Sequence, residues 1–236
     1  MPRSDFARPL IGPIAIDGPA GSGKSSVGKA LASQIGFRFL DTGLMYRAAT
    51  WNAVQNGIDV RDPDAVVMAV SRMEYSVGYG DDGDNLLVVG GEDVTGFLHS
   101  TRVDDSVSAV SAISGVREIM VAEQRRLAGV GEIVMVGRDI GTVVIPGAPL
   151  KIYLTASART RAIRRHRDFV AAAADGEGAD VDFEDILRSI ERRDLVDSTR
   201  EDSPLRPADD ALVLDTDGLS FDEVVDRLVA LAVAVT

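Results

Sequence analysis

The chain has no cysteine, few lysines and no long apolar run. Without cysteine there can be no disulfide, no thiol nucleophile and no thiolate metal site, which fits a cytoplasmic protein. No apolar run approaches the roughly 18 residues that a membrane-spanning helix needs. The beginning of the chain also lacks the apolar segment of a signal peptide. We therefore expect a cytoplasmic protein with no membrane partner, whose residues 1–10 form a flexible tail.

The charge of the chain is strongly negative, yet its cations are concentrated. The net charge of −12 argues against a non-specific nucleic-acid binder. Lysine occurs three times, so 22 of the 25 basic residues are arginine, and ten of these lie between Arg159 and Arg206. The planar guanidinium matches phosphate oxygens, so we expect an anionic ligand near this segment. No stripe of apolar residues demands a partner, and we expect a monomer.

The stretch Ile14–Lys29, IAIDGPAGSGKSSVGK, fits the pattern G-x-x-x-x-G-K-[ST] directly after an apolar run. Glycines let the backbone N–H groups of such a turn point inward, and the next helix adds its unpaired first N–H groups. Lys24 can reach the β- and γ-phosphates, and the Ser25 hydroxyl can complete a Mg²⁺ shell. An ordinary strand–turn–helix junction is disfavoured because strand, spacing and helix occur in order. The predicted nucleoside triphosphate site comprises Gly18, Pro19, Ala20, Gly21, Ser22, Gly23, Lys24, Ser25 and Ser26.

Short apolar runs alternate with helical patterns through most of the chain, which is typical of βαβ units and a parallel sheet. We expect an α/β fold of the P-loop NTPase type, with three α/β/α layers around a five-stranded parallel sheet. The expected strands are 14–16, 37–40, 132–136, 151–154 and 211–214. Residues 143–145 and the following prolines read as a connection. The core domain is predicted to comprise residues 11–60, 99–158 and 201–236.

Two segments depart from this alternation. Residues 61–98 predict a small inserted β/α lobe, with a helix over 63–70, antiparallel strands over 73–79 and 85–89, and a third strand near 93–94. Residues 159–200 predict two arginine-bearing helices joined by a glycine-containing acidic turn, 175–182. These helices suggest a hinged lid that bends at the turn. A helical hairpin with solvated charges is the alternative.

Polar residues follow several of the expected strands, where ligands bind in parallel sheets. Thr42 and Arg47 follow the second strand, and Arg138 and Asp139 follow the third. For Thr42 and Arg47, a helix cap and a solvated arginine are the alternative. Arg117 lies near a helix start, where its charge opposes the dipole, so it is either a surface residue or has an anion nearby.

Taken in order, these segments resemble the bacterial cytidylate kinases, the CMP/dCMP kinase branch of the nucleoside monophosphate kinases. IAIDGPAGSGKSS resembles the phosphate loop of that family, LDTGLMYR its monophosphate-binding turn, and VGRDIGTVVIPGAPLKIYL its third and fourth strands. GGEDVTG resembles the edge of its inserted lobe, and RRDLVDSTREDSPL the exit from its lid. The resemblance covers nearly everything from Ile14 to the final helix. It implies Mg²⁺-dependent transfer of the γ-phosphoryl group of ATP to CMP or dCMP.

The resemblance also implies roles for individual residues. The acceptor phosphate would be held by Thr42, Arg47 and Arg138, and the cytosine edge would be read by Ser108, Arg117 and Asp139. Arg193 and Asp197 would contact the sugar or the transferring phosphate. Arg200 would contact the acceptor nucleotide. Arg161 and Arg165 would hold the donor nucleotide. The implied catalytic cations are Lys24, Arg138, Arg161, Arg165 and Arg193. Thr42 stands where the family more often has serine, and residues 195–199 are less basic than is usual there.

Two other functions stay open at this point. One is a kinase with the same loop that acts on a different monophosphate, on shikimate, on gluconate or on dephospho-coenzyme A. The other is a regulatory ATPase or nucleotide switch, although the chain contains no guanine-reading N-K-x-D.

Overall fold

The computed structural model of this chain describes residues 12–174 and 182–235. The expected flexible tail, residues 1–10, lies outside the described residues. So do residues 175–181, which make up nearly all of the expected hinge.

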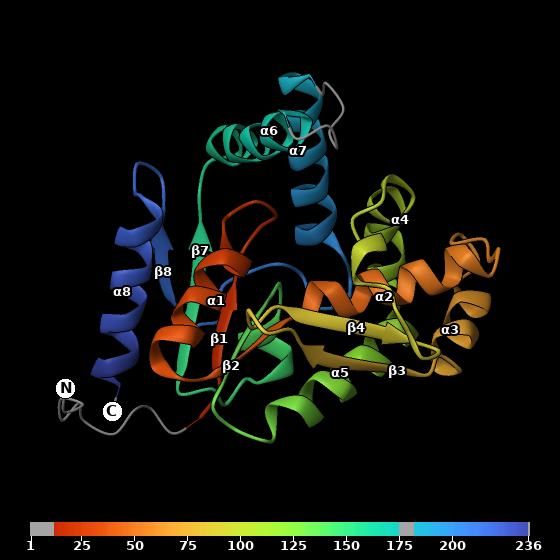
Figure 1. The fold of residues 1–236 in the computed structure, drawn as a ribbon, viewed down its shortest axis with the longest axis horizontal. Coiled ribbons are helices and arrows are strands. Elements are labelled where there is room, and N and C mark those ends of the chain that lie inside the picture. Colours follow the sequence, from red (N-terminus) through yellow and green to blue (C-terminus); the bar gives the residue numbers. More distant parts are fainter. Residues whose placement is uncertain (1–11, 175–181, 236) are drawn as a thin grey trace.

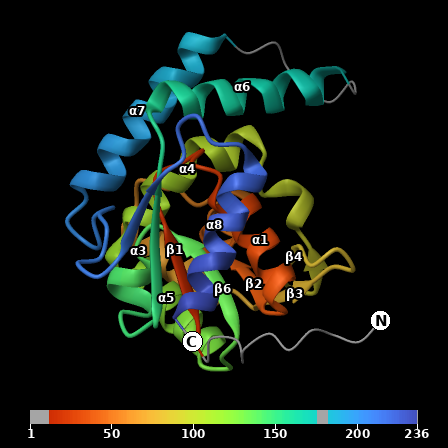
Figure 2. The ribbon, with the colours of Figure 1, turned by 90° about the vertical axis from the view of Figure 1, so that its left-hand side faces the viewer.

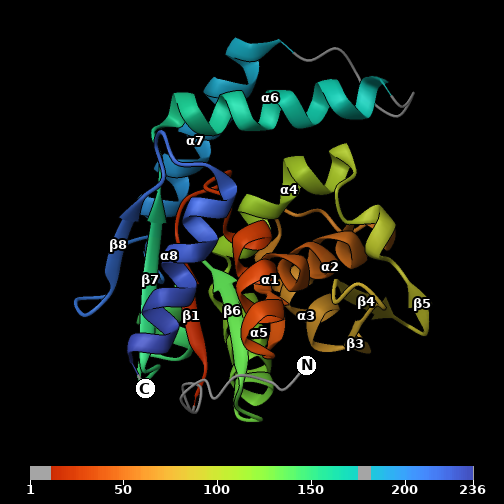
Figure 3. The ribbon, with the colours of Figure 1, turned by 60° about the vertical axis from the view of Figure 1, so that its left-hand side comes forward.

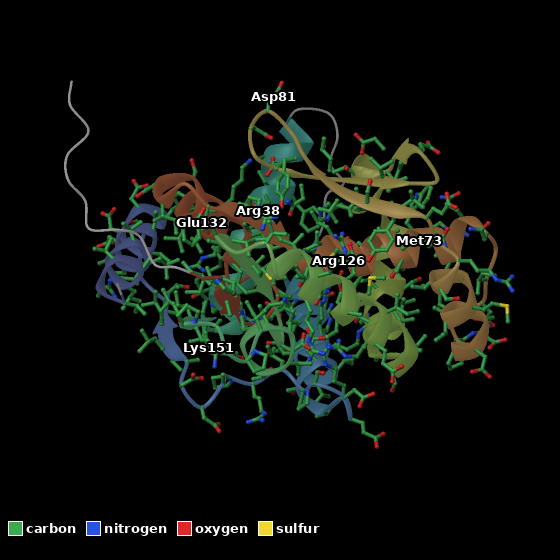
Figure 4. The ribbon with its side chains drawn as sticks, turned by 90° about the horizontal axis from the view of Figure 1, so that it is seen from below. Arg38, Met73, Asp81, Arg126, Glu132 and Lys151 are labelled. Carbon is green, nitrogen blue, oxygen red and sulfur yellow. The ribbon has the colours of Figure 1, made fainter. Side chains whose placement is uncertain are left out.

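Five parallel strands form the main sheet, in the order β2-β6-β1-β7-β8, which confirms the predicted architecture. The central strand, β1, is buried along its whole length, as expected of a parallel strand covered on both faces. Arg38 and Glu132 lie side by side where β2 meets β6 (Figure 4), and the Arg38 N–H donates to the Glu132 carbonyl over 2.9 Å. The strands are β1 (Ile14–Asp17), β2 (Arg38–Asp41), β6 (Ile133–Gly137), β7 (Leu150–Thr155) and β8 (Leu212–Asp215).

Helices cover both faces of this sheet. On one face, α1 (Lys24–Ile35) and α8 (Phe221–Ala234) share an apolar cluster with β1, β6 and β7; Figure 3 shows both helices in front of the strands. On the other face, α2 (Thr42–Gln55), α4 (Thr101–Ala112) and α5 (Ser114–Ala128) share a second cluster. The three layers agree with the prediction. No helix in the described ranges is long and apolar enough to cross a membrane.

The inserted lobe is present but has no separate core. It consists of α3 (Pro63–Ser71), β3 (Tyr75–Tyr79), β4 (Asn85–Val89), β5 (Glu92–Asp93) and the 3₁₀ turn η1 (Thr95–Phe97). Its sheet is antiparallel, in the order β3-β4-β5, and Asp81 lies at the tip of its hairpin (Figure 4). Its buried side chains, among them Val66 and Leu87, belong to the same cluster as those of α2 and α5. The lobe is therefore anchored to the core through a shared apolar interior.

Directly after β6 the chain forms a single π-helical turn, η2 (Ile140–Val144). The sequence predicted a connection at 143–145, and the structure shows that part of this connection is π-helical. The Arg125 guanidinium from α5 donates to the Val143 and Val144 carbonyls over 2.7 and 3.1 Å. It thereby satisfies carbonyls that a helix end leaves unpaired. The short strand β5 begins one residue earlier than expected.

The two lid helices, α6 (Ala158–Ala174) and α7 (Phe183–Thr199), were both predicted. They pack against each other around Ala162, Ile186 and Ile190, a small cluster separate from the two large ones. Figures 1 and 2 place the pair at one end of the molecule, over the carboxyl ends of β1 and β7. The predicted lid segment therefore stands over the edge of the sheet where ligands are expected.

Candidate active site

The loop between β1 and α1 has a backbone that requires glycine. Gly18 has a φ of 152°, and a Cβ there would lie 2.0 Å from the Leu154 carbonyl oxygen. Gly23, at the N-cap of α1, has a φ of 88°. Lys24 is buried, and its Nζ donates to the Pro19 carbonyl over 2.7 Å. Burial, and then repulsion by Arg138, hold the pKa of Lys24 well below its usual range, so an anion at this loop would stabilise the charged amine.

One cavity beside this loop is lined by all nine residues predicted to bind the acceptor. These residues belong to α2, α4, α5, the turn after β6, α7 and the residue that follows α7. They are spread over more than 150 positions of the sequence. These residues are Thr42, Arg47, Ser108, Arg117, Arg138, Asp139, Arg193, Asp197 and Arg200. The cavity is also lined by Lys24, Ser25, Asp41, His99 and Arg165. The fold thus brings the predicted acceptor residues and the phosphate loop together.

A buried ion pair lines part of the cavity. Arg117 and Asp139 are each 4% exposed, and Arg117 Nη2 contacts Asp139 Oδ2. The Asp139 carboxylate is therefore the anion that was expected near Arg117 because of its position at the start of a helix. The alternative, in which Arg117 is a surface residue, is wrong. Arg200 Nη2 lies 3.7 Å from Asp139 Oδ1 and, within the described residues, is buried without a hydrogen-bond partner. A buried donor of this kind indicates a place for a polar ligand.

Several further arginines line the same cavity. Arg47 is buried and donates to the Leu98 carbonyl over 2.8 Å and to Asp104 over 2.6 Å. Arg138 Nε donates to Asp197 over 2.8 Å. Burial, followed by repulsion from Arg138 and Arg47, lowers the pKa of Arg193 to about 10. Cations this close destabilise one another, and an anionic ligand would relieve the repulsion.

The alternatives for Thr42 and Arg47 do not hold in the structure. Asp41, not Thr42, caps α2, because its carboxylate accepts from the Gly43 N–H over 2.9 Å. The Thr42 hydroxyl donates instead to the Val136 carbonyl over 2.9 Å. Arg47 is buried beside the cavity, so it is not a solvated surface arginine.

The two predicted lid arginines have different surroundings. Arg161 is 3% exposed, donates to the Ala20 carbonyl over 2.9 Å and pairs with Asp194. It therefore holds α6 against the phosphate loop. Arg165 lines the cavity and lies 3.6 Å from Asp104. The role of either residue as a donor clamp stays a prediction.

A second cavity also adjoins the phosphate loop. It is lined by residues 21–27 of the loop and α1, by Arg164, Arg165 and Asp168 of α6, and by residues around the start of α8. Arg165 faces both cavities. Sequence reasoning missed Arg164, which donates to the Thr216 carbonyl over 2.8 Å. Nothing local in the sequence separates Arg164 from its arginine neighbours.

Sequence reasoning also missed two acids at strand ends. Asp41 Oδ2 contacts the Ser25 hydroxyl. Asp17 accepts from the Ile140 and Gly141 N–H groups over 2.8 and 2.7 Å, and burial raises its pKa to about 6. Both are the last residues of parallel strands. The strand-end rule that selected Thr42 and Arg138 applies to them equally, and it would have found both.

The donor set at Ser25 and Asp41 fits a magnesium ion. A hydroxyl and a carboxylate oxygen are hard ligands of the kind that Mg²⁺ takes. Within the part of the chain that the structure describes, no group of three or more His, Cys, Asp or Glu side chains could hold a metal. A cation here would therefore need phosphate oxygens and water as its further ligands.

The chain is similar to known proteins over most of its length. The family model described as cytidylate kinase matches residues 14–234. A cytidylate kinase of Rhodococcus opacus (strain B4) is 50% identical over 91% of this chain and 92% of its own length. One of Mycobacterium avium (strain 104) is 51% identical over the same shares of the two chains. Among solved structures, a shikimate kinase from Bacteroides thetaiotaomicron is 12% identical with a TM-score of 0.47, over 94% of this chain and 98% of that one.

Proposed function

This chain belongs to the cytidylate kinase family, and on that premise we propose that it transfers the γ-phosphoryl group of ATP to CMP or dCMP. The products are ADP and CDP or dCDP, and Mg²⁺ accompanies the donor. The family predicted from the sequence is thereby confirmed. The cytoplasmic location and the monomeric state stay predictions.

One observation carries the choice of a cytosine nucleotide, namely the buried Arg117–Asp139 pair in the same cavity as the phosphate loop. A carboxylate offers about four acceptor positions, and Arg117 occupies one of them. The others can accept the exocyclic amine of cytosine, while the guanidinium donates to the ring nitrogen or carbonyl. Uracil has a carbonyl in place of that amine and would leave the carboxylate facing a lone pair. Hydrogen bonds built into a site can discriminate by roughly 10⁴-fold.

The cations of the same cavity suit the phosphate side of the reaction. An oxygen of the CMP phosphate attacks the γ-phosphorus, and the bond to the β–γ bridging oxygen breaks, so the protein needs no nucleophile of its own. Catalysis then depends on alignment and on neutralising charge that is spread over the transferring group. Lys24, Arg138 and Arg193 line the cavity where this charge would lie. Ser25 and Asp41 would hold Mg²⁺, which would further neutralise the phosphate charge.

An ADP-release assay with ATP and Mg²⁺ tests this function. It is run in parallel with CMP, dCMP, UMP, AMP, GMP and no acceptor. We expect turnover with CMP and dCMP that exceeds turnover with the other monophosphates by at least 10²-fold. Preference for a different monophosphate would contradict the assignment of Arg117 and Asp139 to cytosine. Release of ADP that is independent of every acceptor would indicate an ATPase instead.

A further inference from the structure

The free edge of strand β2 is paired by a side chain from the inserted lobe. β2 is the outermost strand of the main sheet. Its residue Arg38 bonds toward β6, so the carbonyl of Phe39 and the N–H of Asp41 face outward. Asn85, the first residue of β4, is 2% exposed. Its Nδ2 donates to the Phe39 carbonyl over 2.8 Å, and its Oδ1 accepts from the Asp41 N–H over 2.7 Å.

The Asn85 side-chain amide replaces the backbone of one residue of a sixth strand, because it offers one hydrogen-bond donor and one acceptor to the edge of β2. It does so at the last residue of β2, where the chain leaves the sheet and enters the cavity. The carboxylate of that residue, Asp41, contacts the Ser25 hydroxyl with one oxygen and the Gly43 N–H with the other. A continuous set of contacts therefore runs from Asn85 in the lobe through Asp41 to Ser25 in the phosphate loop.

We propose that Asn85 is a positioning residue that fixes Asp41 against Ser25 and thereby sets metal-dependent binding of the donor nucleotide. That the ligand is a donor nucleotide with Mg²⁺ rests on the proposed function. The contacts among Asn85, Asp41 and Ser25 do not depend on which acceptor is used. The acceptor side has its own anchor, because the Thr42 hydroxyl is bonded to the Val136 carbonyl of β6. Loss of Asn85 should therefore affect Mg²⁺ and donor together but leave CMP binding largely unchanged.

The first test compares N85L with the wild-type chain. Leucine keeps the approximate size of asparagine but forms neither hydrogen bond. ADP binding is measured by titration calorimetry with Mg²⁺ and with EDTA, and CMP binding is measured separately. Partners that orient a metal ligand are typically worth 10- to 100-fold in metal affinity. We expect the Mg²⁺-dependent gain in ADP affinity to fall about tenfold, with metal-free ADP and CMP affinities within about twofold of wild type.

A matched control is T95V. The Thr95 hydroxyl, in η1, accepts from the Leu87 N–H of β4 over 2.9 Å. Neither residue lines the cavity that contains Asp41. T95V should lower the melting temperature and leave the Mg²⁺-dependent gain unchanged. If N85L does not fold, N85D is used in its place, because it keeps the shape and the acceptor while its ionised carboxylate cannot donate to Phe39.

A double-mutant cycle with D41N decides whether Asn85 acts through Asp41. In the D41N background the Asn85 substitution should cause no further loss of the Mg²⁺-dependent gain. An equal loss in both backgrounds, or an equal loss of every ligand's affinity, would overturn the proposal. So would a wild-type chain whose ADP affinity does not respond to Mg²⁺. Because no transfer is measured, a failed acceptor screen would overturn the proposed substrate without touching this result.

Discussion

At the scale of single residues, the site is built from charges that the sequence separates widely. Arg117 and Asp139 are 22 positions apart, and Arg138 and Asp197 are 59 apart. The sequence identified each of these residues as a site candidate, from its position after a strand, from its position at a helix start or from the family resemblance. It did not predict which of them form ion pairs with one another. The pairing matters because a guanidinium that contacts a buried carboxylate fixes the orientation of that carboxylate. It is then ready to accept from a ligand.

The residue that tests this arrangement is Asp139. In D139N the side chain keeps its shape but loses its charge and half of its acceptor positions. A hydrogen bond to a charged group is worth about 1.5–3 kcal/mol, so we expect kcat/KM for CMP to fall roughly 10- to 100-fold. The preference for CMP over UMP should fall by a similar factor. The KM for ATP should stay within about twofold.

Initial rates with CMP and UMP at varied ATP give all three quantities. D210N is the control, because Asp210 also pairs with a buried cation, Lys151, but lines neither of the two cavities described. It should leave the CMP preference unchanged. An equal loss for every acceptor in D139N would mean that Asp139 serves only to hold Arg117.

At the scale of helices and strands, the sequence predicted most of the fold. The runs at 14–16 and 133–136 are continuous and apolar because both faces of these strands are buried. In the structure, a capping box formed by Ser220 and Glu223 marks the start of α8. The π-turn η2 could not be predicted. It is held by Asp17 from β1 and Arg125 from α5, so its conformation depends on distant groups rather than on local propensity.

The close packing of α1 against β6 allows a prediction about stability. A Cβ on Gly28 would lie 2.6 Å from Val136 Cγ1 and 3.2 Å from Phe39 Cε2. Overpacking of this kind costs about 1–3 kcal/mol, whereas alanine gains only about 1 kcal/mol over glycine in a helix. We expect G28A to lower the free energy of unfolding by about 1 kcal/mol in urea denaturation. S33A, on an exposed part of the same helix, should change it by less than about 0.5 kcal/mol. A G28A protein as stable as wild type would show that the overpacking cost does not exceed the helix gain of about 1 kcal/mol.

At the scale of the whole molecule, the lid helices are apolar toward each other and polar toward the body. Their cluster around Ile186 and Ile190 shares no member with the two large clusters. Several of their contacts with the core are polar, such as Arg161 to the Ala20 carbonyl and Arg138 to Asp197. A unit with its own interior can open and close as one body over the cavity. Hydrogen bonds to phosphate oxygens can replace these polar contacts between lid and core without exposing an apolar core.

Hydrogen exchange in the nucleotide-free protein tests whether the lid is such a unit. Ile186 is buried in the small cluster, and I186A should lower the protection of amides in α6 and α7 by about 2 kcal/mol, near the lower end for a buried isoleucine. Strands β1 and β7 should keep their protection, since none of their buried residues touches this cluster. L228A, in the cluster that α8 shares with the sheet, is the matched control, and it should lower protection in the strands. Loss of protection in β1 and β7 by I186A equal to that in the lid would mean that lid and core unfold together. The lid could then not close independently of the core.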